Sequence, residues 1–156
     1  QIGGHFILET AEGPLDTSTL KSDLMLIYFG YTYCPDVCPT ELARMAGIYE
    51  GLGDDQARVS GLFVTVDPKR DTVNAVTEYA QVFDPSFKGL SGDQGQIEQV
   101  MRQYQVYAQK VGDDPENYTV DHSSRIYLMD RDAKLMALFS MDTEIPVMIE
   151  QVKKFL

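Results

Sequence analysis

The feature that most limits the fold of this chain is a run of six apolar residues, Leu24 to Phe29, which ends at Gly30. No polar side chain interrupts the run. Strands that alternate between a polar and an apolar face do not have this pattern, whereas strands buried on both faces do. The sequence therefore predicts a fully buried strand at this point.

Helical and extended patterns alternate along the rest of the chain. Apolar residues recur at helical spacing within Leu42–Leu52, Val73–Phe83, Ile97–Tyr104 and Ile145–Val152, and extended patterns cover Val59–Val66, Ser124–Met129 and Leu135–Phe139. A hairpin with its turn at Gly13-Pro14 precedes them, and Gly112–Tyr118 is polar and is expected to be a loop.

This order predicts an α/β, thioredoxin-like fold. Strands that alternate with helices imply a parallel core with crossover connections, and the last two strands add antiparallel members. We therefore expect a mixed central sheet, an N-terminal hairpin extension and an inserted helix. The 156 residues are enough for one hydrophobic core, so residues 1–156 are interpreted as a single domain.

The charge of the chain argues against a nucleic-acid partner. It has 24 acidic and 13 basic residues, which gives a net charge of −11, whereas phosphate binding needs a basic face. The sequence has no run of eighteen apolar residues, so no transmembrane helix is expected within it. It begins at Gln1 without a signal-peptide pattern, and we interpret it as a mature or trimmed form.

Cys34 and Cys38 are the only cysteines, and they lie between the buried strand and the first helix. If the segment is helical, a spacing of four places both sulfurs on one face, where a modest adjustment closes a disulfide. The positive end of the helix is expected to favour thiolates. Thiolates are the nucleophiles of redox exchange and also the soft ligands that select Cu(I), so both chemistries remain open.

His122 follows Asp121 directly before a predicted strand. In a thioredoxin-like fold, the loop that enters this strand lies against the start of the cysteine helix. An imidazole beside two thiolates gives a three-ligand site that suits copper, whereas zinc commonly takes a fourth ligand. Asp121 either orients the imidazole ring as an outer hydrogen-bond acceptor or caps the adjacent turn.

A second polar segment, Asp67 to Thr72, follows the next predicted strand. In one interpretation the segment is a turn in which Asp71 caps the helix after it. Asp67 either belongs to this turn or lies near the cysteines, because ligands collect at the carboxyl edge of such sheets. His5 is expected at the surface. Met45, Met101 and Met148 lie on apolar helix faces and are interpreted as packing residues.

Four motifs together resemble the Sco/SenC family of copper proteins, which help to assemble the copper centre of cytochrome c oxidase. They are Gly3-Gly4 with Phe6 and Leu8, Phe29 to Pro39, Val66 to Thr72, and Asp121-His122-Ser123. The resemblance spans nearly the whole chain.

The resemblance implies a copper chaperone with Cys34, Cys38 and His122 as ligands of Cu(I) or Cu(II). The implied partners are the oxidase subunit that carries the dinuclear copper centre, and a periplasmic copper donor or thiol reductant. The implied location is the periplasmic side of the bacterial inner membrane, or the mitochondrial intermembrane space in a eukaryote. An N-terminal helix, which this sequence lacks, would supply the tether.

Two enzymatic alternatives remain. The first is a thiol–disulfide oxidoreductase that reduces the oxidase copper-site cysteines; it needs a reversible Cys34–Cys38 bond and tolerates the loss of His122. The second is a peroxidase, because Val37 to Glu41 looks like the peroxiredoxin cysteine segment. That family places a threonine three residues before its reactive cysteine. Here proline precedes Cys38 and tyrosine precedes Cys34 at that distance, which argues against this chemistry.

Overall fold

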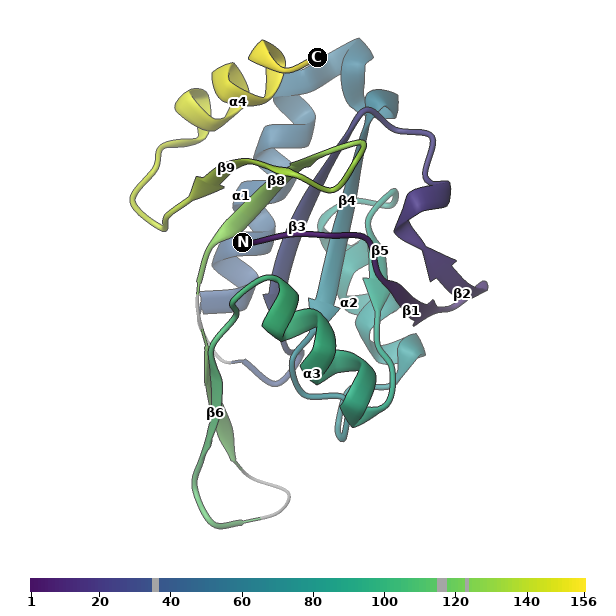
Figure 1. Ribbon diagram of the computed structural model, residues 1–156. Coiled ribbons are helices and arrows are strands. Elements are labelled where there is room, and N and C mark those ends of the chain that lie inside the picture. The colour runs from purple at the N-terminus through teal and green to yellow at the C-terminus, as the bar shows by residue number, and fades with distance from the viewer. Residues whose placement is uncertain (35–36, 115–117, 123) are drawn as a thin grey trace.

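The computed structural model describes residues 1–34, 37–114, 118–122 and 124–156 (Figure 1); the side chains of residues 37 and 119–122 are outside this description. Its centre is a five-stranded sheet with the strand order β5-β4-β3-β8-β9. The strands are β3 (Leu24–Gly30), β4 (Val59–Thr65), β5 (Lys88–Leu90), β8 (Ile126–Asp130) and β9 (Leu135–Phe139). The order and directions give the mixed α/β sheet that the sequence predicts.

Strand β3 occupies the middle of this sheet, and all of its residues are buried. It pairs in parallel with β4 and antiparallel with β8. The prediction of a strand covered on both faces is therefore confirmed. Because β3 and β4 run in the same direction, the segments that follow them leave the sheet at the same edge.

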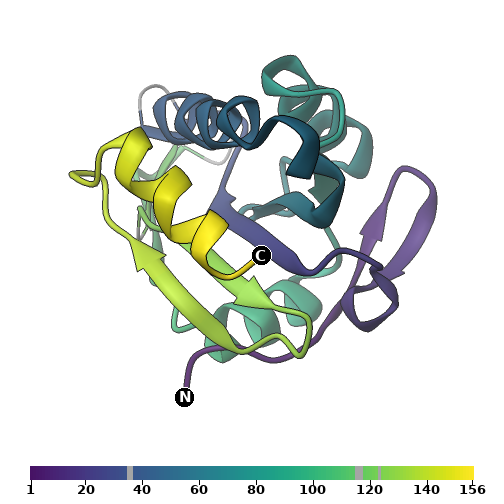
Figure 2. The same ribbon diagram turned by 90° about the horizontal axis from the view of Figure 1, so that it is seen from above.

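Helices cover both faces of the sheet (Figure 2). They are α1 (Val37–Leu52), α2 (Val73–Phe83), α3 (Gln94–Gln103) and α4 (Ile145–Lys154), with short 3₁₀ turns at Thr17–Thr19 and Gly53–Arg58. Helices α1, α2 and α4 lie on one face, where α1 packs against α4, and α3 lies on the other. This placement follows from right-handed crossovers that carry the chain from β3 to β4 and on to β5.

The N-terminal hairpin consists of β1 (Ile7–Thr10) and β2 (Gly13–Asp16), which pair antiparallel. The predicted turn position was wrong by two residues: the turn lies at 11–12, and Gly13 opens β2 with a φ of 103°. Glu9 bridges Ser91, so the hairpin extends the β5 side of the molecule.

Strand β5 was missed in the sequence, and so were two strands outside the central sheet, β6 (Ala108–Val111) and β7 (Thr119–His122). Strands β6 and β7 form a separate antiparallel pair that is not hydrogen-bonded to the central sheet. The predicted loop over Gly112–Tyr118 connects them, and its residues 115–117 lie outside the described part. Strand β6 extends from the edge of the sheet at which α1 begins (Figure 1).

None of the helices in the described part of the chain is long and apolar enough to cross a membrane.

Candidate metal centre

The two cysteines lie just beyond the carboxyl end of β3. Cys34 is in the segment that leaves the strand, and Cys38 is in the first turn of α1. The backbone N–H of Cys38 donates to the Cys34 sulfur at 3.4 Å. The structure thus brings the two side chains together, as their spacing predicts. Both belong to the described residues, and no disulfide joins them.

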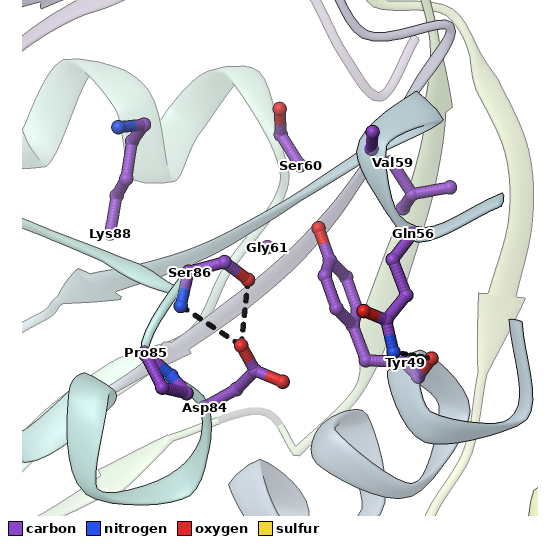
Figure 3. A pocket seen from close by; sticks show the side chains of 10 residues that line it. Tyr49, Gln56, Val59, Ser60, Gly61, Asp84, Pro85, Ser86 and Lys88 are labelled. Atoms are coloured by element: carbon purple, nitrogen blue, oxygen red, sulfur yellow. Dashed lines mark hydrogen bonds between the residues drawn. The ribbon is translucent and has the colours of Figure 1, made fainter. Parts of the chain in front are cut away.

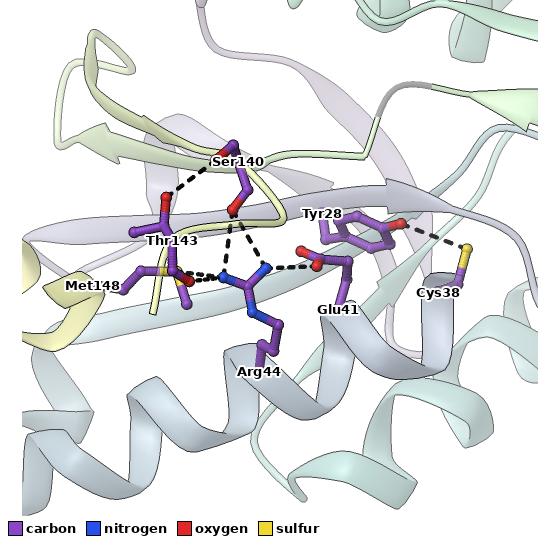
Figure 4. Close-up of polar contacts among 7 residues, drawn as sticks. All are labelled: Tyr28, Cys38, Glu41, Arg44, Ser140, Thr143 and Met148. Atoms are coloured by element: carbon purple, nitrogen blue, oxygen red, sulfur yellow. Dashed lines mark hydrogen bonds and ion pairs between the residues drawn. The ribbon is translucent and has the colours of Figure 1, made fainter. Parts of the chain in front are cut away.

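Cys38 is fully buried, whereas Cys34 is partly exposed. The hydroxyl of Tyr28 on β3 donates to the Cys38 sulfur at 3.7 Å (Figure 4). The contact with the Cys34 side chain, together with burial, raises the pKa of the Cys38 thiol. This direction is opposite to the one that the helix dipole predicts, because the hydrogen bond with the Cys34 side chain and the desolvation of a buried thiolate together outweigh a partial charge. Binding a metal ion at Cys38 therefore has to release a proton.

An ion pair fixes the helix that carries Cys38. Glu41 is 1% exposed, and its Oε1 lies 2.6 Å from Nη1 of Arg44. Arg44 also donates to the carbonyl oxygens of Ser140 and Thr143, at the entrance to α4 (Figure 4). These contacts tie α1 to the connection between β9 and α4. Sequence reasoning missed this network, since a Glu and an Arg three residues apart usually lie on a solvated helix face.

Asp71 holds the start of the segment that leaves β3, Tyr31 to Cys34, which we call the cysteine loop. Its carboxylate accepts hydrogen bonds from the backbone N–H of Thr32 at 2.9 Å, from the Thr32 hydroxyl at 2.6 Å and from the Thr65 hydroxyl at 2.8 Å. Burial raises the pKa of this carboxyl group. The prediction that Asp71 caps α2 was wrong: Thr72 is the cap, and its hydroxyl accepts from the backbone N–H of Ala75.

Asp67 lies after β4 and is also buried. Its Oδ2 accepts from Nε of Arg70 at 2.6 Å, and its Oδ1 accepts from the hydroxyl of Tyr118 at 2.7 Å. The guanidinium carbon of Arg70 lies 4.4 Å from the ring centre of Tyr33, the neighbour of Cys34. Asp67 therefore lies beside the cysteine loop. This position favours the interpretation that Asp67 lies near the cysteines over the one in which it only belongs to a turn.

Asp121 and His122 lie in β7, not in a loop as predicted. Asp121 pairs with Gln109, and His122 pairs with Ala108. Strand β8, which begins four residues after His122, runs antiparallel to β3 and pairs Ile126 with Tyr28. The backbone before β8 therefore lies beyond the carboxyl end of β3, where the cysteine loop also starts.

The side chains of Asp121 and His122 are outside the described part of the structure. Among the side chains that are described, no group of three histidine, cysteine or acidic residues is arranged to hold a metal ion. The three-ligand site of Cys34, Cys38 and His122 therefore stays a prediction.

The other predicted features have mixed outcomes. His5 is partly buried, and its Nδ1 lies 2.9 Å from the hydroxyl of Thr17. Met45 and Met148 are fully buried, and Met101 packs against the core. Their role as packing residues is confirmed.

One hollow of the described surface lies far from the cysteines. It has a volume of about 580 Å³ and is lined by Tyr49, Gln56, Ser60, Asp84 and Lys88, among others (Figure 3). It lies at the start of β4, which is the opposite edge of the sheet from the ends of β3 and β4.

Gly30 is the residue that lets Cys38 pack against the end of β3. A Cβ atom at this position would lie 2.7 Å from the Cys38 sulfur and 2.9 Å from the Tyr28 ring. We expect Gly30→Ala to lower the free energy of unfolding by about 1–3 kcal/mol, because a packed core resists added volume. Urea denaturation of the reduced protein measures this loss. Gly95→Ala in α3, where the nearest contact would be 3.4 Å, is the control, and equal behaviour of the two variants would contradict the steric argument.

Comparison with known proteins decides the family. The SCO1/SenC family model matches residues 1–156. The chain belongs to this family. It is 43% identical over 153 residues to an SCO2-like protein of Rickettsia conorii, with 96% of this chain and 75% of that protein covered. It is 36% identical over 145 residues to the human mitochondrial SCO1 homolog, with 90% of this chain and 48% of that protein covered.

Solved Sco structures have the same fold. ScoI of Bradyrhizobium japonicum with copper bound is similar with a TM-score of 0.90 and 40% identity, and all of both chains is covered. Arabidopsis thaliana ScoI with copper bound also gives a TM-score of 0.90, at 34% identity, with 99% of this chain and 98% of that chain covered. These similarities confirm the thioredoxin-like fold and the Sco/SenC resemblance.

Proposed function

We propose that this Sco-family protein binds copper through Cys34, Cys38 and His122 and delivers it during the assembly of cytochrome c oxidase. The observation that carries the proposal is the contact between the cysteines, with the Cys38 N–H 3.4 Å from the Cys34 sulfur, at the sheet edge that β7 also reaches. Two sulfurs and an imidazole are ligands that copper prefers. The copper-bound ScoI relatives support the choice of metal.

The delivery step is an exchange of ligands. Copper, which is the cargo here, binds the reduced thiols as their protons leave, and a partner's thiolate or imidazole then replaces each ligand in turn. Cys34 is partly exposed, whereas Cys38 is buried, so Cys34 is the sulfur that a partner reaches first. Oxidation of the pair to a disulfide would take away two electrons, two protons and two ligands, and so would switch copper binding off.

The proposed partner is the oxidase subunit that carries the dinuclear copper centre, with a copper donor or a thiol reductant acting before it. The proposed location is the periplasmic side of the bacterial membrane or the mitochondrial intermembrane space. Relatives described as mitochondrial and a relative from Rickettsia conorii are consistent with both settings. We infer that residues 1–156 work as one domain.

The test is an anaerobic copper titration of the reduced protein against a competing chelator. We expect wild-type protein to bind one equivalent, and His122→Ala to bind it at least about tenfold more weakly, because a nitrogen ligand is lost. His5→Ala is the matched control, since this histidine contacts Thr17 in the N-terminal segment. Equal affinity of wild type and His122→Ala would remove His122 from the site.

The closeness of the two sulfurs also supports the alternative, a thiol–disulfide oxidoreductase that reduces the oxidase cysteines. The two functions differ in their need for His122. Reduction of a disulfide substrate should be abolished by Cys34→Ala and mostly retained by His122→Ala. If His122→Ala loses neither copper affinity nor thiol exchange, the reductase becomes the better description of the protein.

A further inference from the structure

Beside the cysteine loop is a group of aromatic and charged side chains, which we call the Arg70 cluster: the largely buried Asp67, Arg70 and Tyr118, and the exposed Tyr33 and Lys110. Arg70 and Asp67 form an ion pair at 2.6 Å, and their side chains are 10% and 6% exposed. The guanidinium carbon of Arg70 lies 3.6 Å from the ring centre of Tyr118 and 4.4 Å from that of Tyr33. A planar guanidinium stacks well on aromatic faces, and a lysine does so less well.

Tyr118 is held at three points. Its hydroxyl donates to Oδ1 of Asp67 at 2.7 Å, one face of its ring contacts Arg70, and Nζ of Lys110 lies 4.5 Å from the ring centre. A hydrogen bond to a buried carboxylate is among the stronger contacts in a protein. Tyr118 is 7% exposed although it belongs to an extended surface hairpin.

The cluster joins three separate parts of the chain. Tyr33 belongs to the cysteine loop, Asp67 and Arg70 belong to the connection between β4 and α2, and Lys110 and Tyr118 belong to the β6–β7 hairpin. The hairpin needs such an anchor. It is not hydrogen-bonded to the central sheet, and three of the four residues of β6 are exposed. An isolated two-stranded hairpin is marginally stable in water.

We propose that the Arg70 cluster clamps the β6–β7 hairpin onto the cysteine loop, and that Tyr118 thereby positions His122 for copper. Tyr118 immediately precedes β7, and His122 ends that strand. The proposal rests on the proposed copper function. It also gives Asp67 a positioning role, because its two carboxylate oxygens accept hydrogen bonds from Tyr118 and Arg70.

Tyr118→Phe tests the clamp, because it keeps the ring that stacks on Arg70 and removes only the hydroxyl that donates to Asp67. The first readout is amide hydrogen exchange of metal-free, reduced protein. We expect the amides of β6 and β7 to exchange about tenfold faster, and those of β3 to be unchanged. Tyr107→Phe is the matched control, since the Tyr107 hydroxyl contacts Gln109 within the same segment.

The second readout is copper affinity in a double-mutant cycle with His122→Ala. We expect Tyr118→Phe to weaken copper binding by about tenfold in the wild-type background and to have no further effect in His122→Ala. A residue that acts only on overall stability would weaken binding by the same factor in both backgrounds. The cycle therefore separates positioning of His122 from a general structural role.

Each outcome decides the matter. Unchanged hairpin exchange in Tyr118→Phe would overturn the clamp. Faster exchange with equal losses of copper affinity in both backgrounds would overturn the positioning of His122. If wild type and His122→Ala bind copper equally, the proposed ligand set fails, and the positioning proposal fails with it. The exchange data, collected without copper, would then show separately whether the cluster holds the hairpin.

Discussion

Replacing Cys38 by serine is expected to lower the copper affinity of the reduced protein by more than about a hundredfold. Loss of a residue that only hydrogen-bonds to a metal ligand already lowers affinity by up to about a hundredfold, and loss of a ligand itself should cost more. Serine has nearly the same shape as cysteine, so the burial of the site is kept. Its hydroxyl oxygen, however, is a hard ligand that remains protonated, whereas copper selects soft thiolates. Competition with a chelator under anaerobic conditions measures the loss.

Cys34→Ser is expected to cause a loss of similar size, because either change leaves one sulfur. Met141→Ser is the control for the loss of a sulfur atom outside the site, since Met141 is 50% exposed in the turn after β9. Copper affinity within about tenfold of wild type in Cys38→Ser would show that Cys38 is not a ligand. Cys34 would then have to bind copper with other partners, and the buried sulfur would serve redox chemistry alone.

The parts of the fold that sequence predicts well have one periodicity over many residues. The apolar run of β3 predicts a strand that is buried on both faces, and the repeated apolar steps of α1 predict a helix with one buried face. The structure confirms both elements. Strand β5 has only three residues, which is too short for a pattern. Strand β6 is mostly exposed, so it lacks the apolar alternation of a half-buried strand.

In the candidate site, too, contacts between residues close in the sequence could be predicted, and contacts between distant residues could not. The spacing of Cys34 and Cys38 is local, and the backbone N–H of Cys38 in the first turn of α1 donates to the Cys34 sulfur. The contacts of Asp71 with Thr32, and of Tyr118 with Asp67, join residues 39 and 51 positions apart. Nothing in the local sequence indicates such pairs. Asp71 was mistaken for a helix cap because Asp and Thr are both good caps, and only the distant Thr32 amide decides which of them turns inward.

The buried ion pair behind the cysteine helix carries the largest expected effect on stability. Arg44→Ala should lower the free energy of unfolding by about 3–5 kcal/mol, because it leaves the Glu41 carboxylate buried without its charged partner. Glu41 is 1% exposed, and its Oε2 already has no hydrogen-bond partner in the described part of the structure. The variant would also release the contacts of Arg44 with Ser140 and Thr143 between α1 and the start of α4.

Urea denaturation of the reduced, metal-free protein measures this effect, and Arg58→Ala is the matched control. Arg58 pairs with Asp23 at 2.7 Å, close to the 2.6 Å of the buried pair, but the two side chains are 47% and 30% exposed. Water replaces the lost partner there, so we expect a loss below about 1 kcal/mol. Equal losses in the two arginine variants would show that burial of Glu41 does not control the strength of the pair. Partial recovery in Arg44→Ala/Glu41→Gln, which removes the buried charge, would show that the unpaired carboxylate causes the loss.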